Sequence, residues 1–329
     1  MIDASVLATF TAHGGRVATA RAAFGGAGGG GDWIDLSTGI APWAWPADAV
    51  QPALDRLPEP GEIAALEAAA AQAFGVADPA RVVAVPGTDL AMRLLAPLLA
   101  ADRPAVVTPG YAGHAAAWRC AAAIPQATAE AVAPHDLVVL ASPANPDGRV
   151  TDPALLRDLS RDRIVVVDEA YADPAPGLCG QASDRLVVLR SFGKFYGLPG
   201  LRLGFVVAGP DVTRRLRAML GDWPLSMPAI AIGTAAYRDT VWRAKQQARI
   251  VEAGAMLDGL LTDSGLAIVG SAGLFRLVAV PRAHALFDTL ARHAILTRPF
   301  AAAADRLRIG LPRGAAALAR LAAALESLP

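Results

Sequence analysis

The lysine content of the chain singles out one side chain. Among the 30 Lys and Arg residues, only Lys194 and Lys245 are lysines. Lys245 lies in an Arg- and Gln-rich stretch that is typical of a solvated helix face. Lys194 instead follows the apolar run Leu186–Leu189, which predicts that its amine lies at the end of a buried strand. An amine on a flexible stem in an apolar pocket is the group that forms Schiff bases with carbonyl compounds.

A carboxylate stands at the end of a second apolar run. Asp168 directly follows Ile164–Val167, so it is expected in a poorly solvated place, where it needs a cationic or hydrogen-bonding partner. Tyr171, three residues later, is within reach of the same pocket. The alternative is that Asp168 only caps the next element, and the residues alone leave both interpretations open.

Two further loops carry polar residues after apolar runs. The segment Gly87–Asp89 follows Val82–Val85 and opens a helix, where free backbone N–H groups can bind an anion. The alternative is a plain helix cap by its threonine or aspartate. The segment Ser142–Gly148 presents Asn145 between prolines, although the same composition is typical of a simple turn.

The elements that must position these loops alternate between strands and helices. The apolar runs are continuous rather than alternating, which favours strands buried on both faces of a mostly parallel sheet. We expect these strands at Val82–Val85, Ala105–Thr108, Leu137–Leu140, Ile164–Val167, Leu186–Leu189 and Leu203–Val207, with a helix over Ala112–Ala122 between the second and third. Ligands of such sheets bind at the carboxyl ends of the strands, so the four loops are expected to converge there.

The pattern changes after Asp211. A long helical stretch over Pro228–Thr262 precedes short strands at Leu266–Val269, Leu274–Val280 and Arg306–Ile309. This pattern predicts a smaller α+β layer. We therefore expect three parts: an N-terminal arm over residues 1–45 that packs with the small domain, a large domain over 46–220, and the small domain over 221–329.

The composition excludes several classes of protein. The 30 basic and 30 acidic residues give no net charge, which predicts neither a nucleic-acid partner nor a membrane surface. Cys120 and Cys179 have no metal-ligand spacing, so no metal is expected. No apolar stretch approaches the roughly 20 residues of a membrane helix, and the N-terminus has no signal-peptide pattern. We predict a cytoplasmic protein.

The four loops, taken in order, resemble the aspartate-aminotransferase-like fold of pyridoxal-phosphate enzymes. The runs Asp168–Tyr171 and Ser191–Gly204 are similar to the histidinol-phosphate aminotransferase branch. The resemblance covers roughly Trp33 to Leu311. It implies an α/β fold with a mostly parallel central sheet flanked by helices, and pyridoxal 5'-phosphate as the cofactor. Lys194 would bind the cofactor as a Schiff base, and Asp168 would pair with the protonated pyridine nitrogen.

The same resemblance implies contacts for further residues. Asn145 and Tyr171 would hydrogen-bond the 3-oxygen of the cofactor ring, and Tyr111 would stack on that ring. Arg308 matches the position that takes the substrate carboxylate. The residues that would line the cofactor phosphate are Gly87, Thr88, Asp89, Ser191 and Arg202.

The N-terminal part is similar to a narrower family, the threonine-phosphate decarboxylases of cobalamin biosynthesis. The similarity lies in the run His13–Gly15 and in Asp35–Pro42. These enzymes convert O-phospho-L-threonine, a phosphorylated amino acid, into (R)-1-aminopropan-2-yl phosphate. His13, Gly39, Asn145 and Arg308 would then contact the substrate. For His13, an ordinary polar role in the arm stays open.

Two other functions are compatible with parts of this pattern. One is an aminotransferase that acts on histidinol phosphate or a related amino acid. The other is a non-catalytic member of the fold, which predicts loss of Lys194 or Asp168, and both are present.

Two positions depart from the family pattern. Leu57–Pro60 stands where many relatives have a Tyr-Pro-Asp-Pro run that reaches the neighbouring subunit, and Gly193 replaces a small hydroxyl residue. A homodimer is implied by the resemblance alone.

Overall fold

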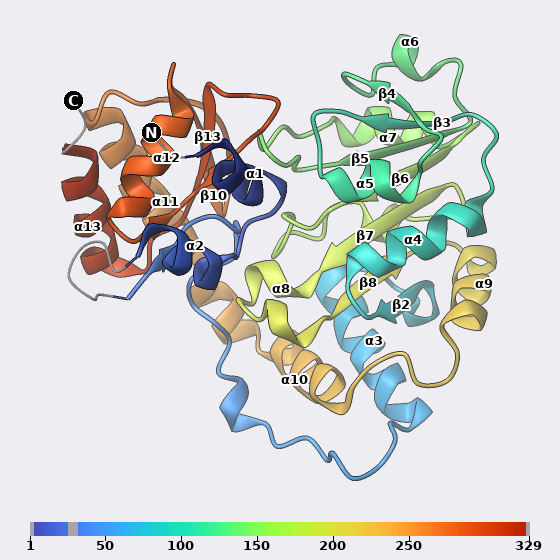
Figure 1. The fold of residues 1–329 in the computed structure, drawn as a ribbon. Coiled ribbons are helices and arrows are strands. Elements are labelled where there is room, and N and C mark those ends of the chain that lie inside the picture. Colours follow the sequence, from blue (N-terminus) through green and yellow to red (C-terminus); the bar gives the residue numbers. More distant parts are fainter. Residues whose placement is uncertain (1–2, 26–31, 327–329) are drawn as a thin grey trace. The chain divides into compact units, whose positions relative to one another are not determined.

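The computed structural model describes residues 3–25 and 32–326 (Figure 1). The chain divides into two compact units. Unit 1 comprises Met1–Trp43 and Gln246–Pro329, and unit 2 comprises Ala44–Lys245. The N-terminal arm is thus grouped with the C-terminal part of the chain. No helix in the described part of the chain is long and apolar enough to cross a membrane.

Unit 2 is built on a seven-stranded sheet with the strand order β2-β8-β7-β6-β5-β3-β4. Only β8 runs against the other strands, because it pairs antiparallel with both β2 and β7. The expected mostly parallel sheet is therefore confirmed. The strands are β2 (Val82–Val85), β3 (Pro104–Val107), β4 (Ala122–Ile124), β5 (Leu137–Ala141), β6 (Ile164–Asp168), β7 (Leu186–Ser191) and β8 (Gly204–Val207).

The register of the sheet places the candidate residues at one edge. In β6, Asp168 pairs with Ala141 of β5 and with Leu189 of β7. Val165, Val166 and Val167 before it are fully buried, as expected for strands covered on both faces. The loops that follow β5, β6 and β7 therefore start side by side.

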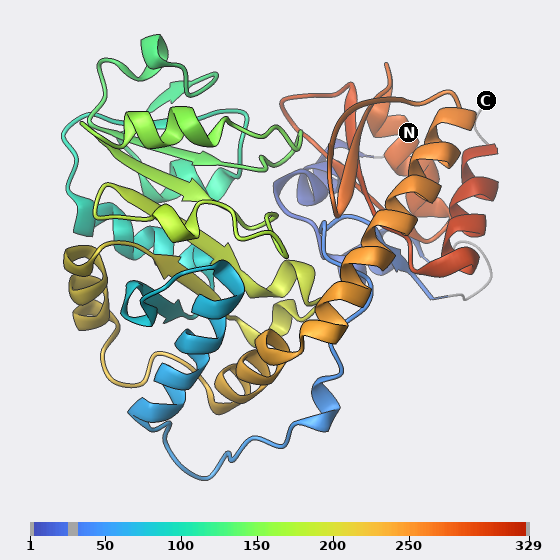
Figure 2. The ribbon, with the colours of Figure 1, turned by 180° about the vertical axis from the view of Figure 1, so that it is seen from behind.

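The helices of unit 2 cover both faces of this sheet (Figure 2). Helix α3 (Pro60–Phe74) begins with a capping box between Glu59 and Glu62, and α10 (Met227–Arg238) packs against it. The remaining helices of this unit are α4 (Thr88–Leu99), α5 (Ala112–Ala117), α6 (Ala129–Val132), α7 (Pro153–Leu159), α8 (Phe192–Phe195) and α9 (Pro210–Leu220).

Unit 1 contains a four-stranded antiparallel sheet of order β12-β13-β10-β9. A short parallel pair joins β1 (Ile34–Asp35) to β11 (Ile295–Leu296). The other strands are β9 (Ala267–Ala272), β10 (Phe275–Ala279), β12 (Arg298–Pro299) and β13 (Arg306–Gly310). The helices are α1 (Ala4–Ala12), α2 (Val17–Phe24), α12 (Ala283–Arg292), α13 (Gly314–Glu326) and most of α11 (Thr240–Asp263).

Three boundaries differ from the sequence expectation. The units divide within α11 rather than near residue 220, because α10 packs on α3 of unit 2. The helical stretch expected over Pro228–Thr262 is broken at Asp239, whose carboxylate accepts the N–H of Trp242 at 2.9 Å and starts a new helix. The helix expected over Ala112–Ala122 ends at Ala117, and β4, which was not expected, pairs with β3.

Candidate active site

A buried carboxylate and a buried imidazole form the centre of the site in unit 2. Asp168 is only 5% exposed, and its Oδ2 lies 3.0 Å from Nε2 of the fully buried His114 in α5. The other oxygen, Oδ1, accepts the N–H of Ala170 at 3.1 Å. Because a carboxylate only accepts, we infer that His114 donates from Nε2. The two donors fix the orientation of the Asp168 carboxylate.

A positively polarised helix start lies at the end of β2. Gly87 caps α4 with a φ of +87°, and a Cβ built on it would come within 2.8 Å of Nη2 of Arg202. A Cβ on Gly204 would likewise come within 2.9 Å of the backbone nitrogen of Thr88. These glycines allow the guanidinium and the helix N-terminus to lie close together. Backbone N–H groups beside an arginine form a cradle for a phosphate group.

Tyr111 is held beside the His114 ring. Its hydroxyl donates to Oδ1 of Asp89 at 3.1 Å, and its ring meets His114 edge to face at a centroid distance of 5.6 Å. Burial, together with the charge and hydrogen bond of Asp89, raises the pKa of Tyr111 to about 12. Tyr111 is therefore a hydrogen-bond donor to Asp89 at neutral pH, and this bond helps to hold its ring in place.

Lys194 lies in α8, directly after β7. Its Nζ is 5.6 Å from the centroid of the Tyr171 ring, so the structure brings these two residues together. Ser191 is the N-cap residue of α8. A Cβ at Gly193 would lie only 2.8 Å from Cα of Pro199, which explains why glycine replaces the small hydroxyl residue there.

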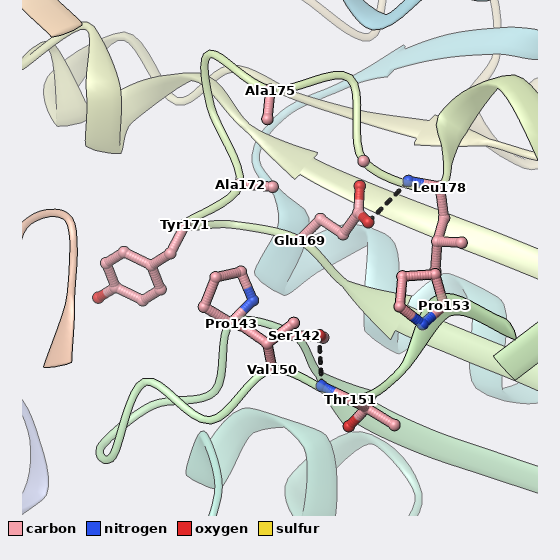
Figure 3. Close-up of a pocket in the computed structure, with 11 residues that line it drawn as sticks. Ser142, Pro143, Val150, Thr151, Pro153, Glu169, Tyr171, Ala172, Ala175 and Leu178 are labelled. Carbon is pink, nitrogen blue, oxygen red and sulfur yellow. Dashed lines mark hydrogen bonds between the residues drawn. The ribbon is translucent and has the colours of Figure 1, made fainter. Parts of the chain in front are cut away.

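The loops after β5 and β6 enclose a small pocket (Figure 3). Ser142 Oγ accepts the N–H of Thr151 at 3.1 Å, which closes the loop that carries Asn145. Glu169 points toward Leu178, whose N–H it accepts at 2.9 Å. Tyr171 points the opposite way. The turn after β6 therefore separates a structural carboxylate from a residue of the candidate site.

The donor set in unit 2 fits a pyridoxal-phosphate molecule. An amine suits its aldehyde, a buried carboxylate suits its ring nitrogen, and the glycine-lined helix start with an arginine suits its phosphate. These groups come from Lys194, Asp168 and the Gly87–Asp89 segment with Arg202, all within one unit.

The predicted substrate residues His13, Gly39 and Arg308 belong to unit 1, where two arginines stand opposite each other on paired strands. Arg298 of β12 pairs in register with Arg308 of β13. Arg308 donates to the carbonyl of Ser37 at 2.6 Å. Arg298 donates to the carbonyls of Phe10 and Ala12 at 2.5 and 2.8 Å, near the end of α1. Like charges directly opposite on paired strands destabilise a sheet, so this arrangement favours a bound anion.

Electrostatics support this interpretation of Arg298. Burial and the charges of Arg308 and Arg16 lower the pKa of Arg298 to about 10. Arg298 forms no ion pair with the residues that the structure describes. Nothing in the sequence pattern singles out Arg298, Arg16 or His114. The pairing of Arg298 with Arg308 depends on strand register, which the sequence pattern does not reveal.

The glycines of the N-terminal motif have a structural explanation. The N–H of Gly15 donates to Oγ of Ser37 at 2.8 Å, and a Cβ on Gly14 would collide with the Ser37 carbonyl. Gly39 has a φ of +59°, a conformation that favours glycine. His13 is exposed and ends α1. The His13–Gly15 motif thus binds the arm to Ser37, whose carbonyl also accepts from Arg308.

Comparisons with known proteins agree with the geometry. A threonine-phosphate decarboxylase from Pseudomonas aeruginosa is 40% identical over 308 residues, which cover 89% of this chain and 91% of that protein. Another threonine-phosphate decarboxylase, from a Sinorhizobium species, is 40% identical over 331 aligned residues, covering 96% and 98%.

A solved structure shares the fold. Histidinol-phosphate aminotransferase from Sinorhizobium meliloti, in complex with pyridoxal-5'-phosphate, has a TM-score of 0.73 at 23% identity and covers 89% of this chain and 91% of that one. This likeness confirms the expected aminotransferase-type α/β fold. The family model for aminotransferase class I and II matches residues 47–325. The chain therefore belongs to the aminotransferase class I and II family.

Proposed function

We propose that this chain is a pyridoxal-phosphate-dependent decarboxylase that converts O-phospho-L-threonine into (R)-1-aminopropan-2-yl phosphate for cobalamin biosynthesis. The observation that carries this proposal is 40% identity, over nearly the whole chain, to two threonine-phosphate decarboxylases. The arginine pair of unit 1 adds a chemical reason, because it suits a substrate that carries a phosphate as well as a carboxylate.

The residues of unit 2 would hold the cofactor. When bound, pyridoxal phosphate draws electrons from the bond on the substrate's α carbon that stands perpendicular to its ring. Asp168 would keep a proton on the ring nitrogen, since its two donors hold the carboxylate in place. The start of α4, Ser191 and Arg202 would bind the phosphate. Tyr171 and Asn145 would donate to the ring oxygen.

The residues of unit 1 would orient the substrate. Arg298 and Arg308 are held by backbone carbonyls, so their guanidinium groups are positioned before the substrate arrives. A phosphate held at one end determines which bond on the α carbon is broken, because rotation about that carbon is restricted. His13 and Gly39 belong to the same unit and are proposed to contact this end of the substrate.

The decisive assay supplies the holoenzyme with O-phospho-L-threonine and no keto acid. Sustained release of carbon dioxide and aminopropanol phosphate is the expected result. If neither is released, but histidinol phosphate and 2-oxoglutarate yield glutamate, the decarboxylase proposal is wrong and the aminotransferase alternative replaces it. If neither reaction occurs, a non-catalytic role is favoured.

The lysine assignment has a matched control within the chain. Lys194→Ala is expected to abolish the yellow absorbance of the lysine-bound cofactor, together with turnover. Lys245→Ala, on the exposed face of α11, is expected to retain both. Retention of the absorbance in the Lys194 variant would contradict the assignment.

We also propose that the enzyme is a cytoplasmic homodimer, as the resemblance to related enzymes implies. Leu54 and Leu57 are 77% and 60% exposed in the segment before α3, so an interface that covers them would bury apolar surface. Light scattering of the holoenzyme would give the mass in solution, and a monomer would contradict this part of the proposal.

A further inference from the structure

Unit 2 contains a buried polar cluster that the proposed reaction does not use. Its members come from five different segments: the loop after β6, the end of β7, the residue after α8, and helices α10 and α11. They are Asp173, Arg190, Tyr196, Tyr237 and Arg243. Arg190, Tyr196 and Tyr237 are at most 2% exposed, and the Asp173 side chain is 3% exposed.

Arg190 is the centre of this cluster. One terminal nitrogen donates to Glu169 and to the carbonyl of Pro176, both at 3.2 Å. The other donates to Asp173 Oδ1 and, at 2.9 Å, to the carbonyl of Ala175. The guanidinium also lies 4.7 Å above the Phe74 ring. Its Nε and the second oxygen of Asp173 nevertheless have no hydrogen-bond partner in the described part of the chain.

The two tyrosines pack against the same group. Their rings meet edge to face at a centroid distance of 5.0 Å, and Tyr237 contacts Phe74 at 5.4 Å. Arg243 donates to the carbonyl of Pro174, next to Asp173, at 3.5 Å. Both tyrosine hydroxyls and the Nε of Arg243 are buried and lack a partner among the described residues. Burial and the nearby Asp173 charge raise the pKa of both tyrosines, so the hydroxyls remain donors.

The unpaired atoms have a definite chemistry. Four are donors, two on arginines and two on tyrosines, and one is a carboxylate oxygen. Such groups are rarely left unpaired, because each would cost its full desolvation energy. Two arginines and the carboxylates of Glu169 and Asp173 balance in formal charge, so no ion is required.

We propose that this cluster is a binding site for ordered water, which accepts from the tyrosine hydroxyls and arginine Nε–H groups and donates to Asp173. A buried water typically makes about three hydrogen bonds to such otherwise unsatisfied groups. Asp173 lies two residues after Tyr171, and Arg190 and Tyr196 flank Lys194. The water therefore joins the two segments that carry the proposed cofactor contacts, and Tyr196 is a positioning residue.

The first test is thermal unfolding of the holoenzyme. Tyr196→Phe and Tyr237→Phe are each expected to lower the Tm by roughly 2 °C, because each removes a bond to water. The double variant should lose less than the sum if both hydroxyls bond the same water network. A Tm that rises or stays unchanged in both single variants would overturn the proposal, since removing an unpaired hydroxyl is not destabilising.

Thr213 provides the matched control. Its buried hydroxyl bonds directly to the carbonyl of Pro210 at 3.2 Å in α9. Thr213→Val should lower the Tm additively with Tyr196→Phe. The positioning role predicts that the pH midpoint of the lysine-bound cofactor's absorbance shifts in Tyr196→Phe and not in Thr213→Val. An unshifted midpoint would refute that role.

A high-resolution crystal structure of the holoenzyme tests the site directly. Density for water within hydrogen-bond distance of both hydroxyls would support the proposal. Direct bonds from both hydroxyls to protein oxygens, or an ion in place of water, would overturn it. These readouts do not depend on which substrate the enzyme uses.

Discussion

Arg190 of unit 2 is fully buried and Arg298 of unit 1 is partly buried, and the surroundings shift the pKa values of these two arginines in opposite directions. Burial by itself would lower the pKa of Arg190, but Asp173 and Glu169 raise it above its usual value. The pKa of Arg298 is instead lowered to about 10 by burial and by its neighbours Arg308 and Arg16. The first charge is already paired within the fold. The second has no ion-pair partner among the described residues, which suits the proposed role in binding an anion.

The largest expected effect is on stability when the paired arginine is replaced. Arg190→Met leaves Glu169 and Asp173 as buried carboxylates without their cation, which costs about 3–5 kcal/mol. Urea unfolding would measure this loss. Combining the change with Glu169→Gln and Asp173→Asn should recover part of the stability. A single variant as stable as the wild type would contradict the role assigned to Arg190.

Replacing Arg298 by methionine should affect the binding of the substrate rather than the stability of the fold. Arg298→Met should leave the free energy of unfolding within about 1 kcal/mol of the wild type, because it also removes a like-charge contact. It should lower kcat/KM for O-phospho-L-threonine about 100-fold, which corresponds to about 2.8 kcal/mol. Steady-state kinetics check this result. An unchanged kcat/KM would mean that Arg298 does not bind the substrate phosphate.

Binding of inorganic phosphate should test the role of Arg298 without a catalytic reaction. Inorganic phosphate added to the holoenzyme at about ten times its Kd should stabilise it by about 1.4 kcal/mol. Thermal unfolding would detect the shift, and the bound cofactor would keep its own phosphate site filled. The Arg298→Met variant should lose the shift, whereas Lys245→Ala should keep it. Equal stabilisation of both variants would place the anion elsewhere.

Much of unit 2 could be predicted from the sequence, because continuous apolar runs identify buried parallel strands. Asp168 directly follows such a run, and Lys194 is one of only two lysines in the chain, so the sequence pattern singles out both. His114 was missed because it lies within an Ala-rich segment with no local signal. Arg298 was missed because its role depends on its register with Arg308, and β12 has only two residues. Pairings between distant segments require the folded structure.

The charge of Asp168 is paired less completely than that of Arg190 and more completely than that of Arg298. Asp168 is as buried as Glu169, but its carboxylate accepts hydrogen bonds from an imidazole and a backbone N–H, whereas Glu169 is bound by a guanidinium. These donors orient Asp168 without a permanent cation, so its charge remains available for a cationic ring nitrogen. The two consecutive carboxylates thus have different roles: Glu169 stabilises the fold, and Asp168 is proposed to act on the cofactor.

Removing the imidazole donor of Asp168 should have the smallest of the expected effects. His114→Leu removes one donor from Asp168, and we expect kcat to fall about fivefold, near 1 kcal/mol. His114→Gln keeps a donor of similar reach and should recover part of the loss. Stopped-flow absorbance of the lysine-bound cofactor would show whether the chemical step has slowed. If both variants reacted at the wild-type rate, the imidazole would serve only to fill the space beneath α5, and Ala170 N–H alone would be sufficient to orient Asp168.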